Sequence, residues 1–277
     1  MLSLDVLLVA GLAAMAIVSN PPDGLRDSWL LRQSEWDGWT PADLIFPVVL
    51  FVAGARIPFS RRHSSWTSIL RVGLLIIAAG LLLSGSPSFD VSHWRIPGVL
   101  QRIGICYLVT AAAYRATSGD VRRRGAILMS AGVFLTIGYW LVLQHVPVPG
   151  GVAGDLSPEG NLGAYVDRAL MGRHLGRSRW DPEGALSTVP AVATTLFGVV
   201  CGLCLASGER PGRKVQQLAA AGAGGVAGGL LWSVVLPINK SLWSSSFAVF
   251  GAGVASLLVA LCYWAIDVKR GAAGRRV

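Results

Sequence analysis

Eight apolar segments divide this chain, and they constrain its fold more than any other feature. They cover residues 4–19, 42–57, 69–83, 97–115, 125–143, 187–207, 215–236 and 244–266. A helix needs about 20 mainly apolar residues to cross a bilayer, with roughly 17 as a lower limit. The pattern therefore predicts an all-α, polytopic transmembrane helix bundle of about eight spans, which we interpret as one domain over residues 1–277.

The charged residues support a membrane rather than a nucleic acid as the partner. They make up 14% of the chain, against about 25% in soluble proteins. The net charge is +9, but the basic residues lie in short loops between apolar segments, where anionic lipid headgroups are their natural partners. We therefore expect contacts with membrane lipid and none with nucleic acid.

The distribution of basic residues also predicts an orientation. Of the 24 Lys and Arg residues, fifteen lie in the loops and tail expected on the side of both termini, eight lie on the opposite side, and Arg102 lies inside a segment. Positive charge gathers on the cytoplasmic side of membrane proteins. We therefore expect both termini in the cytoplasm and a multi-pass protein of the cell (inner) membrane. Because no basic region precedes residues 4–19, we interpret them as a retained span rather than a signal peptide.

Two predicted outer loops, at about residues 20–41 and 144–186, are too long and too polar to be simple connectors. Loops of this length are usually functional or disordered, and their aromatic residues favour order. The four cysteines all lie in apolar segments, so neither a disulfide framework nor a metal site is predicted, although Cys201 and Cys204 form a C-x-x-C pair.

Four polar strings lie where predicted spans begin on the outer side. They are residues 35–47, 94–104, 181–191 and 237–246. A single polar stretch at a span end would be an ordinary helix cap. Four on one face predict a shared pocket.

Two charged residues within the strings leave alternatives open. Asp43 enters an apolar segment, where it is either a helix cap or a functional carboxylate, because an unpaired charge at that depth costs a few kcal/mol. Arg102 lies about one turn inside its segment. It either extends toward the headgroups or pairs with Asp43 or with a carboxylate or phosphate of a ligand.

These strings, with Ser3-Leu4-Asp5 and Asn20 around the first segment, resemble the heparan-alpha-glucosaminide N-acetyltransferase family of transmembrane acyltransferases. The most specific matches are Leu100-Gln101-Arg102-Ile103-Gly104, Asp181-Pro182-Glu183-Gly184 and Pro237-Ile238-Asn239-Lys240-Ser241-Leu242-Trp243. The resemblance implies acetyl transfer from cytosolic acetyl-CoA to an amino sugar on the far side of the membrane. The substrate-binding candidates that it implies are Asn20, Trp36, Gly38, Gln101, Arg102, Asp181, Glu183, Asn239, Lys240 and Trp243.

Departures from the family pattern affect the catalytic candidates. Gln33 stands where the family usually has a catalytic His, three residues before Trp36. An imidazole can accept a proton or carry an acetyl group, whereas a carboxamide can only hydrogen-bond. Candidate replacement bases are Asp43, Glu35, His93 and His174. The usual Arg-Gly of the first span is replaced by Leu8-Val9, and the family generally continues for further spans.

Three functions remain open on this sequence. The first is an active acyltransferase, in which Arg102 and Lys240 hold anionic or carbonyl groups and Asp43, Asp181 and Glu183 handle protons or recognise the amine. The second is a non-catalytic relative that binds a sugar, a lipid or a partner protein. A transporter is the third, and the absence of an internal repeat disfavours it. The oligomeric state is open, a homodimer included.

Overall fold

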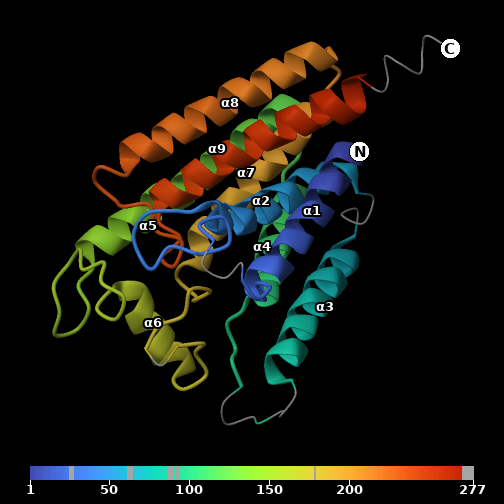
Figure 1. Ribbon diagram of the computed structural model, residues 1–277. Coiled ribbons are helices and arrows are strands. Elements are labelled where there is room, and N and C mark those ends of the chain that lie inside the picture. Colours follow the sequence, from blue (N-terminus) through green and yellow to red (C-terminus); the bar gives the residue numbers. More distant parts are fainter. Residues whose placement is uncertain (25–27, 61–64, 87–89, 91–93, 178, 270–277) are drawn as a thin grey trace.

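The computed structural model describes residues 1–24, 28–60, 65–86, 90, 94–177 and 179–269. Within these ranges the chain forms helices and turns, and no strand (Figure 1). The helices are α1 (Leu2–Ser19), α2 (Pro41–Arg56), α3 (Trp66–Gly85), α4 (Val99–Ala116), α5 (Val121–His145), α6 (Leu162–Met171), α7 (Thr188–Ala206), α8 (Pro211–Trp232) and α9 (Ser245–Cys262). A short 3-10 turn, η1 (Ile57–Phe59), follows α2, and a π-helical segment, η4 (Tyr263–Val268), extends α9.

The predicted all-α bundle is confirmed, because a long helix covers each of the eight apolar segments. Six helical segments of the described chain are long and apolar enough to cross a membrane. Helices α4 and α8 fall outside that set, since α4 carries Gln101 and Arg102 and α8 starts with a polar stretch around Lys214. The chain is thus a polytopic helix bundle, while the count of eight spans and the cytoplasmic termini stay predictions.

The long helices alternate in direction, so the bundle has two distinct ends (Figure 1). At one end, Arg56, the last residue of α2, forms an ion pair with Asp5 of α1 at 2.8 Å, and the backbone N–H of Ser3 donates to Asp267 of η4 at 3.2 Å. We call this the terminal end, because α1 begins there and η4, the last helical segment, ends there (Figure 1). The opposite end carries α6 and the long connections, and we call it the loop end.

Helices α2 and α7 form the buried centre of the bundle, and glycines let their backbones touch. A Cβ at Gly198 would lie 2.0 Å from the carbonyl oxygen of Phe51, and one at Gly54 would lie 2.1 Å from that of Thr195. Gly202 is equally close to Ala55 on the next turn. Without a hydrophobic drive between helices in lipid, such close approach is a main source of helix association.

Replacing Gly198 by Leu should therefore force α2 away from α7. Overpacking a well-packed contact costs about 1–3 kcal/mol, and more where backbone must move. We expect a clear fall in the unfolding temperature of the detergent-purified protein. The matched control is Gly138→Leu in α5, since a Cβ at Gly138 meets nothing within 4 Å. Equal unfolding temperatures for the two variants would contradict close α2–α7 packing.

The second long loop contains a helix that the sequence patterns did not predict. Helix α6 begins at Asn161, whose side chain accepts a hydrogen bond from the N–H of Ala164 at 2.8 Å. The two long loops also contact each other, because the indole N–H of Trp36 donates to the carbonyl of Leu156 and its ring meets Trp180 edge to face at 5.0 Å. These contacts join the described parts of the two loops.

Candidate functional site

The four polar strings meet at the loop end. The first and fourth are joined by the N–H of Gly38, which donates to the carbonyl of Ile238 at 2.7 Å, and by the Asn239 amide, which donates to Asp37 at 3.1 Å. The second and third are joined by Arg95 and Asp181. Segments about 200 residues apart in the chain thus form one polar region, as the sequence predicted.

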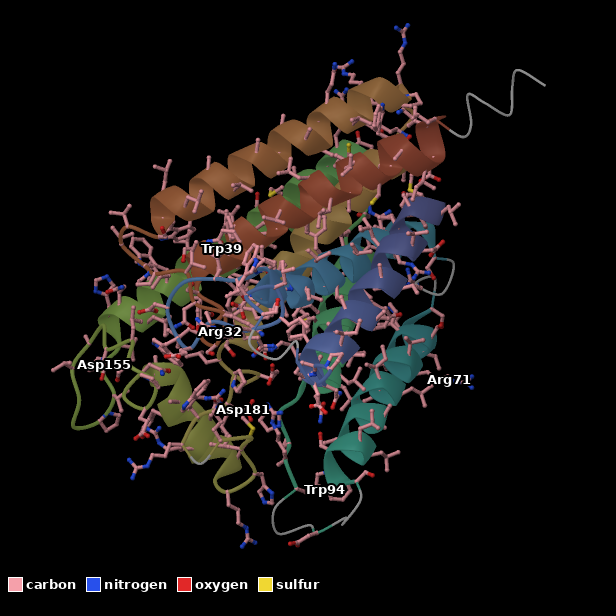
Figure 2. All side chains as sticks on the ribbon, in the orientation of Figure 1. Arg32, Trp39, Arg71, Trp94, Asp155 and Asp181 are labelled. Atoms are coloured by element: carbon pink, nitrogen blue, oxygen red, sulfur yellow. The ribbon has the colours of Figure 1, made fainter. Side chains whose placement is uncertain are left out.

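A cavity of about 310 Å3 opens within this region. Its walls come from the end of α1, the starts of α2 and α4, and the loops before α7 and α9; Figure 2 marks the area with Arg32 and Asp181. The polar side chains that line it include Gln33, Glu35, Arg95, Glu183 and Lys240. The cavity thus offers amide, carboxylate and cationic groups within one space.

Arg95 connects the acidic string to the start of α4. Its Nε and Nη2 donate to the two oxygens of Asp181 at 2.9 and 2.6 Å, and Nη2 also donates to Glu183. Burial by itself would raise the pKa of Asp181, but the hydrogen bonds and charge of Arg95 outweigh it and hold that pKa below its usual range. Asp181 is therefore ionised and fully engaged, so it positions the loop rather than carrying protons.

Arg102 lies behind the cavity wall, almost completely buried. Its Nη2 donates to the hydroxyl of Ser187 and to the carbonyl of Gly184 at 3.3 Å, and its guanidinium lies 5.1 Å from the ring centre of Trp243. The expected alternative of extension to the headgroups is wrong, and Asp43 is not its partner. Nε and Nη1 have no acceptor among the described residues.

Arg102 therefore holds in place the turn that follows Glu183. The contacts to Gly184 and Ser187 are made by one edge of the guanidinium. The remaining three N–H groups, one on Nε and two on Nη1, are costly to bury without acceptors. A guanidinium with free N–H groups is suited to a carboxylate, a phosphate or a water molecule.

Asp43 has the capping role that the sequence left open, and it also forms an ion pair, while its role as a functional carboxylate stays a prediction. At the third position of α2 its Oδ2 accepts hydrogen bonds from the N–H of Ser34, the N–H of Thr40 and the hydroxyl of Thr40, at 2.9–3.0 Å. Its Oδ1 lies 3.4 Å from Nζ of Lys240. Asp43 is thus a helix cap on one oxygen and an ion-pair partner on the other.

Lys240 brings its charge into the cavity wall from the loop between α8 and α9. Burial lowers the pKa of its ammonium, and the carboxylates of Asp43 and Glu183 offset this only in part. Arg102 nearby lowers it further. The cavity wall and the residues directly behind it hold four cationic and four anionic side chains: Arg95, Arg102, Arg177 and Lys240 against Glu35, Asp43, Asp181 and Glu183.

Eight of the ten predicted substrate-binding residues do not line the cavity: Arg102 and Asp181, described above, Trp243, and the five that follow. Asn20 is exposed at the end of α1, and Gln101 points toward α3, where its amide donates to Ser84 at 3.2 Å. Trp36 and Gly38 hold the loops through the contacts given above, and Asn239 is buried in the turn before α9. These positions are occupied by contacts that build the loops, which spacing alone could not distinguish from contacts to a ligand.

The remaining predicted residues lie at or directly behind the wall. Gln33, Glu183 and Lys240 line the cavity, and Trp243 is buried under Arg102 with its indole N–H donating to Thr194 at 3.2 Å. Trp243 adopts a positive φ of 47°, which is unusual for an aromatic residue. The tight turn that it closes is what aims Lys240 at Asp43.

The candidate replacement bases differ in whether they line the cavity. Glu35 lines the cavity, whereas His174 is held against the carbonyl of Trp94 at 2.9 Å and does not line it. His93 lies outside the described residues. Among the described residues, no group of three or more His, Cys, Asp or Glu side chains is placed to hold a metal ion. Glu183 and Glu35 are thus the carboxylates that face the cavity.

Two charged residues that the sequence did not single out support this site. Arg95 lies in the second string, close to Arg102 in sequence. The only signal for its role was that the third string contains two acids, Asp181 and Glu183, which need a cationic partner. Asp167 of α6 is buried behind the same loop and accepts the N–H of Ala185 at 2.8 Å. Burial raises the pKa of Asp167 to about 6, although this hydrogen bond opposes the rise.

The raised pKa of Asp167 predicts a pH dependence of stability. An unfolded Asp has a pKa of about 3.9, so the folded state binds more protons between pH 4 and 6. The stabilisation is complete below about pH 4 and is lost as the pH rises through about 6. An Asp167→Asn variant should lose this part of the slope and gain about 1–2 kcal/mol at pH 7. Unfolding of both proteins in micelles from pH 4 to 7 tests this; parallel curves would contradict it.

Comparison with known proteins adds a distant relationship. No protein-family model matches the chain. Heparan-alpha-glucosaminide N-acetyltransferase of Mus musculus is 29% identical over 87% of this chain, and that of Homo sapiens is 28% identical over the same share. The matches cover 46% and 45% of those proteins, so the chain spans less than half of their length. The chain is a distant relative of these enzymes and an acyltransferase-like, multi-pass membrane protein.

Proposed function

We propose that this protein is a membrane-bound acetyltransferase that moves an acetyl group from acetyl-CoA to the amine of an amino sugar or glycan. The observation that carries the proposal is the loop-end cavity, with Glu183, Lys240 and Gln33 in its wall and balanced charges behind it. A neutral, hydrogen-bonding acceptor such as a sugar suits a cavity whose charges already compensate each other. The relationship to heparan-alpha-glucosaminide N-acetyltransferases supports the same reaction class.

The reaction requires one proton acceptor and one stabiliser of negative charge. The amine nitrogen attacks the thioester carbonyl, the new C–N bond forms, and the C–S bond breaks. Glu183 or Glu35 takes the proton from the amine, and the departing thiolate of CoA takes up a proton. The ammonium of Lys240 is placed to stabilise the developing oxyanion. Gln33 orients the acceptor through its carboxamide.

We propose further that the protein lies in a bacterial inner membrane, with its loop end facing away from the cytoplasm. The basic residues concentrate at the terminal end and so favour that end as cytoplasmic. In this orientation the acceptor reaches the loop-end cavity from the side away from the cytoplasm, and the acetyl group of cytosolic acetyl-CoA has to pass through the bundle to reach it. Labelling of single cysteines introduced at each end of the bundle, with a membrane-impermeant thiol reagent on intact cells, tests this orientation.

A second candidate is a non-catalytic relative that binds a sugar, a lipid or a partner protein. The carboxamide of Gln33 in the cavity wall favours it, because that group cannot act as a base near neutral pH. It leaves the cavity intact but predicts no turnover.

Purified protein with radiolabelled acetyl-CoA and a panel of amino sugars discriminates the two. We expect label on the amino group of at least one amino sugar and none on the matching neutral sugars. Retained binding of acetyl-CoA or sugar without any label transfer would contradict the enzyme and favour the binding protein. In that case, transfer gained by a Gln33→His variant would show that the missing base is the defect.

A further inference from the structure

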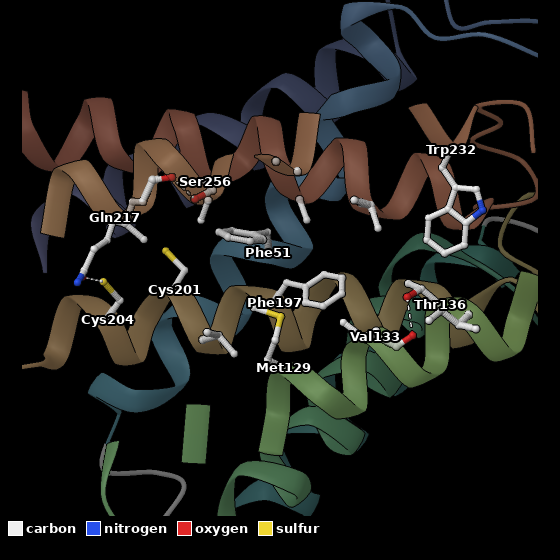
Figure 3. A pocket seen from close by; sticks show the side chains of 18 of the residues that line it. Phe51, Met129, Val133, Thr136, Phe197, Cys201, Cys204, Gln217, Trp232 and Ser256 are labelled. Carbon is white, nitrogen blue, oxygen red and sulfur yellow. Dashed lines mark hydrogen bonds between the residues drawn. The ribbon is translucent and has the colours of Figure 1, made fainter. Parts of the chain in front are cut away.

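A second and larger cavity, of about 610 Å3, lies in the body of the bundle (Figure 3). It shares no lining residue with the loop-end cavity. Helices α5 and α8 form its sides, and α7 and α9 form most of its floor. Its wall is almost wholly apolar, with Phe51, Val133 and Phe197 among the lining side chains.

Small residues and aromatic rings give this cavity the shape of a groove. Ala221 and Gly225 of α8 and Gly253 of α9 leave space along its length. Trp140 and Trp232 meet edge to face at 5.7 Å and close one end, whereas Gln217 and Cys204 mark the other end (Figure 3). The sixteen residues from Gln217 to Trp232 span about 22 Å of helix. One leaflet of a bilayer has about 15 Å of hydrocarbon, so the groove can bury a whole acyl chain.

The end of the groove opposite the tryptophan pair, where the thiol of Cys204 donates to Gln217 at 3.2 Å, is flanked by basic residues. Helical spacing places Arg213 one turn before Gln217 on the groove face of α8. The same spacing places Arg122 two turns before Met129 on the groove face of α5. Both arginines are exposed at the terminal end. Arg213 lies 3.4 Å from Glu209, but an exposed pair of this kind holds its partners weakly.

We propose that this groove binds an anionic phospholipid. Its phosphate lies beyond Gln217, where Arg122 and Arg213 supply charge, and one acyl chain runs between α5 and α8 to the Trp140–Trp232 pair. Charge complementarity favours an anionic lipid over a zwitterionic one, because a basic residue near a membrane surface adds about 1 kcal/mol toward anionic lipid. The proposal does not depend on acetyl transfer, since the groove is separate from the loop-end cavity.

Photoreactive phosphatidylglycerol with a diazirine on its acyl chain tests this proposal. The full chain is reconstituted in phosphatidylcholine nanodiscs with a small fraction of the probe, irradiated, digested and analysed by mass spectrometry. We expect adducts on groove-facing residues of α5 and α8, with unlabelled phosphatidylglycerol competing and phosphatidylcholine not competing.

Two sets of variants, each with a control, test binding of the lipid headgroup and binding of the acyl chain separately. Arg122→Gln with Arg213→Gln should lower labelling at least about fivefold, whereas Arg71→Gln on the exposed face of α3 should not change it. Ala221→Phe should block the groove, whereas Ala220→Phe, an equally exposed neighbour that does not line it, should not.

Two results would overturn the proposal. Equal labelling by a phosphatidylcholine probe would mean that the groove is merely exposed to lipid. Adducts that exclude the groove, together with a smaller particle for Ala221→Phe than for Ala220→Phe in mass photometry, would mean that a second copy of the chain covers it.

Discussion

Replacing Glu183 by Gln is expected to slow acetyl transfer by about 100- to 10,000-fold while leaving the fold intact. The change keeps the size of the side chain but removes the carboxylate that faces the cavity. Arg95 keeps both of its hydrogen bonds to Asp181, so the loop should hold its position. The measurement is the rate of label transfer from acetyl-CoA to the best amino sugar found in the panel.

The controls for this prediction distinguish a base from a structural residue. Glu159→Gln removes an exposed carboxylate of the same loop and should leave the rate unchanged. The rate of the parent protein should rise with pH through the ionisation of its base, and Glu183→Gln should lose that limb. If Glu35→Gln instead lost the rise of the rate with pH, and Glu183→Gln kept it, the base would be Glu35 and the proposed role of Glu183 would be wrong.

Asp43→Asn is expected to lower the free energy of unfolding by about 2–3 kcal/mol. Breaking a buried ion pair from one side leaves the other charge unpaired, which typically costs about 3–5 kcal/mol. We expect somewhat less here, because Lys240 retains slight contact with the cavity and can lose its proton. Denaturant unfolding in mixed micelles at pH 7 measures the change.

A double-mutant cycle tests the origin of this loss. Lys240→Met alone should cost only about 1 kcal/mol, because Asp43 keeps three hydrogen-bond donors on its other oxygen. The double variant Asp43→Asn with Lys240→Met should lie within about 1 kcal/mol of the parent, since an apolar replacement of a buried pair is nearly neutral. Strictly additive losses would show that the two residues do not interact.

The convergence of the four strings was predictable from the chain. Polar stretches that precede spans of the same direction must lie at the same end of a bundle, and the contact between Asp37 and Asn239 shows that they do. The partners within the site were not predictable. Asp43 pairs with Lys240 and not with Arg102, because the turn closed by Trp243 brings Lys240 to the start of α2.

The loop before α7 shows the same division. Its length and aromatic content indicated order, but helix α6 is only ten residues long and its pattern is too short for a firm prediction. The role of Arg95 as the partner of both acids depends on how this loop folds back over α4. Such a contact depends on loop geometry rather than on helical spacing.

The apolar segments by themselves determined that this chain is a polytopic helix bundle, because unpaired backbone groups cannot be left in lipid and a helix satisfies them within each segment. The order of the polar strings determined which end carries the candidate site. Only the tertiary structure decided which charges pair, that Arg102 is buried behind the wall, and that Glu183 and Lys240 are the two of the ten predicted substrate-binding residues that line the cavity. The physical reason is that helix formation depends on residues that are neighbours in the chain, whereas a site depends on side chains that are distant in the chain and come together in the fold.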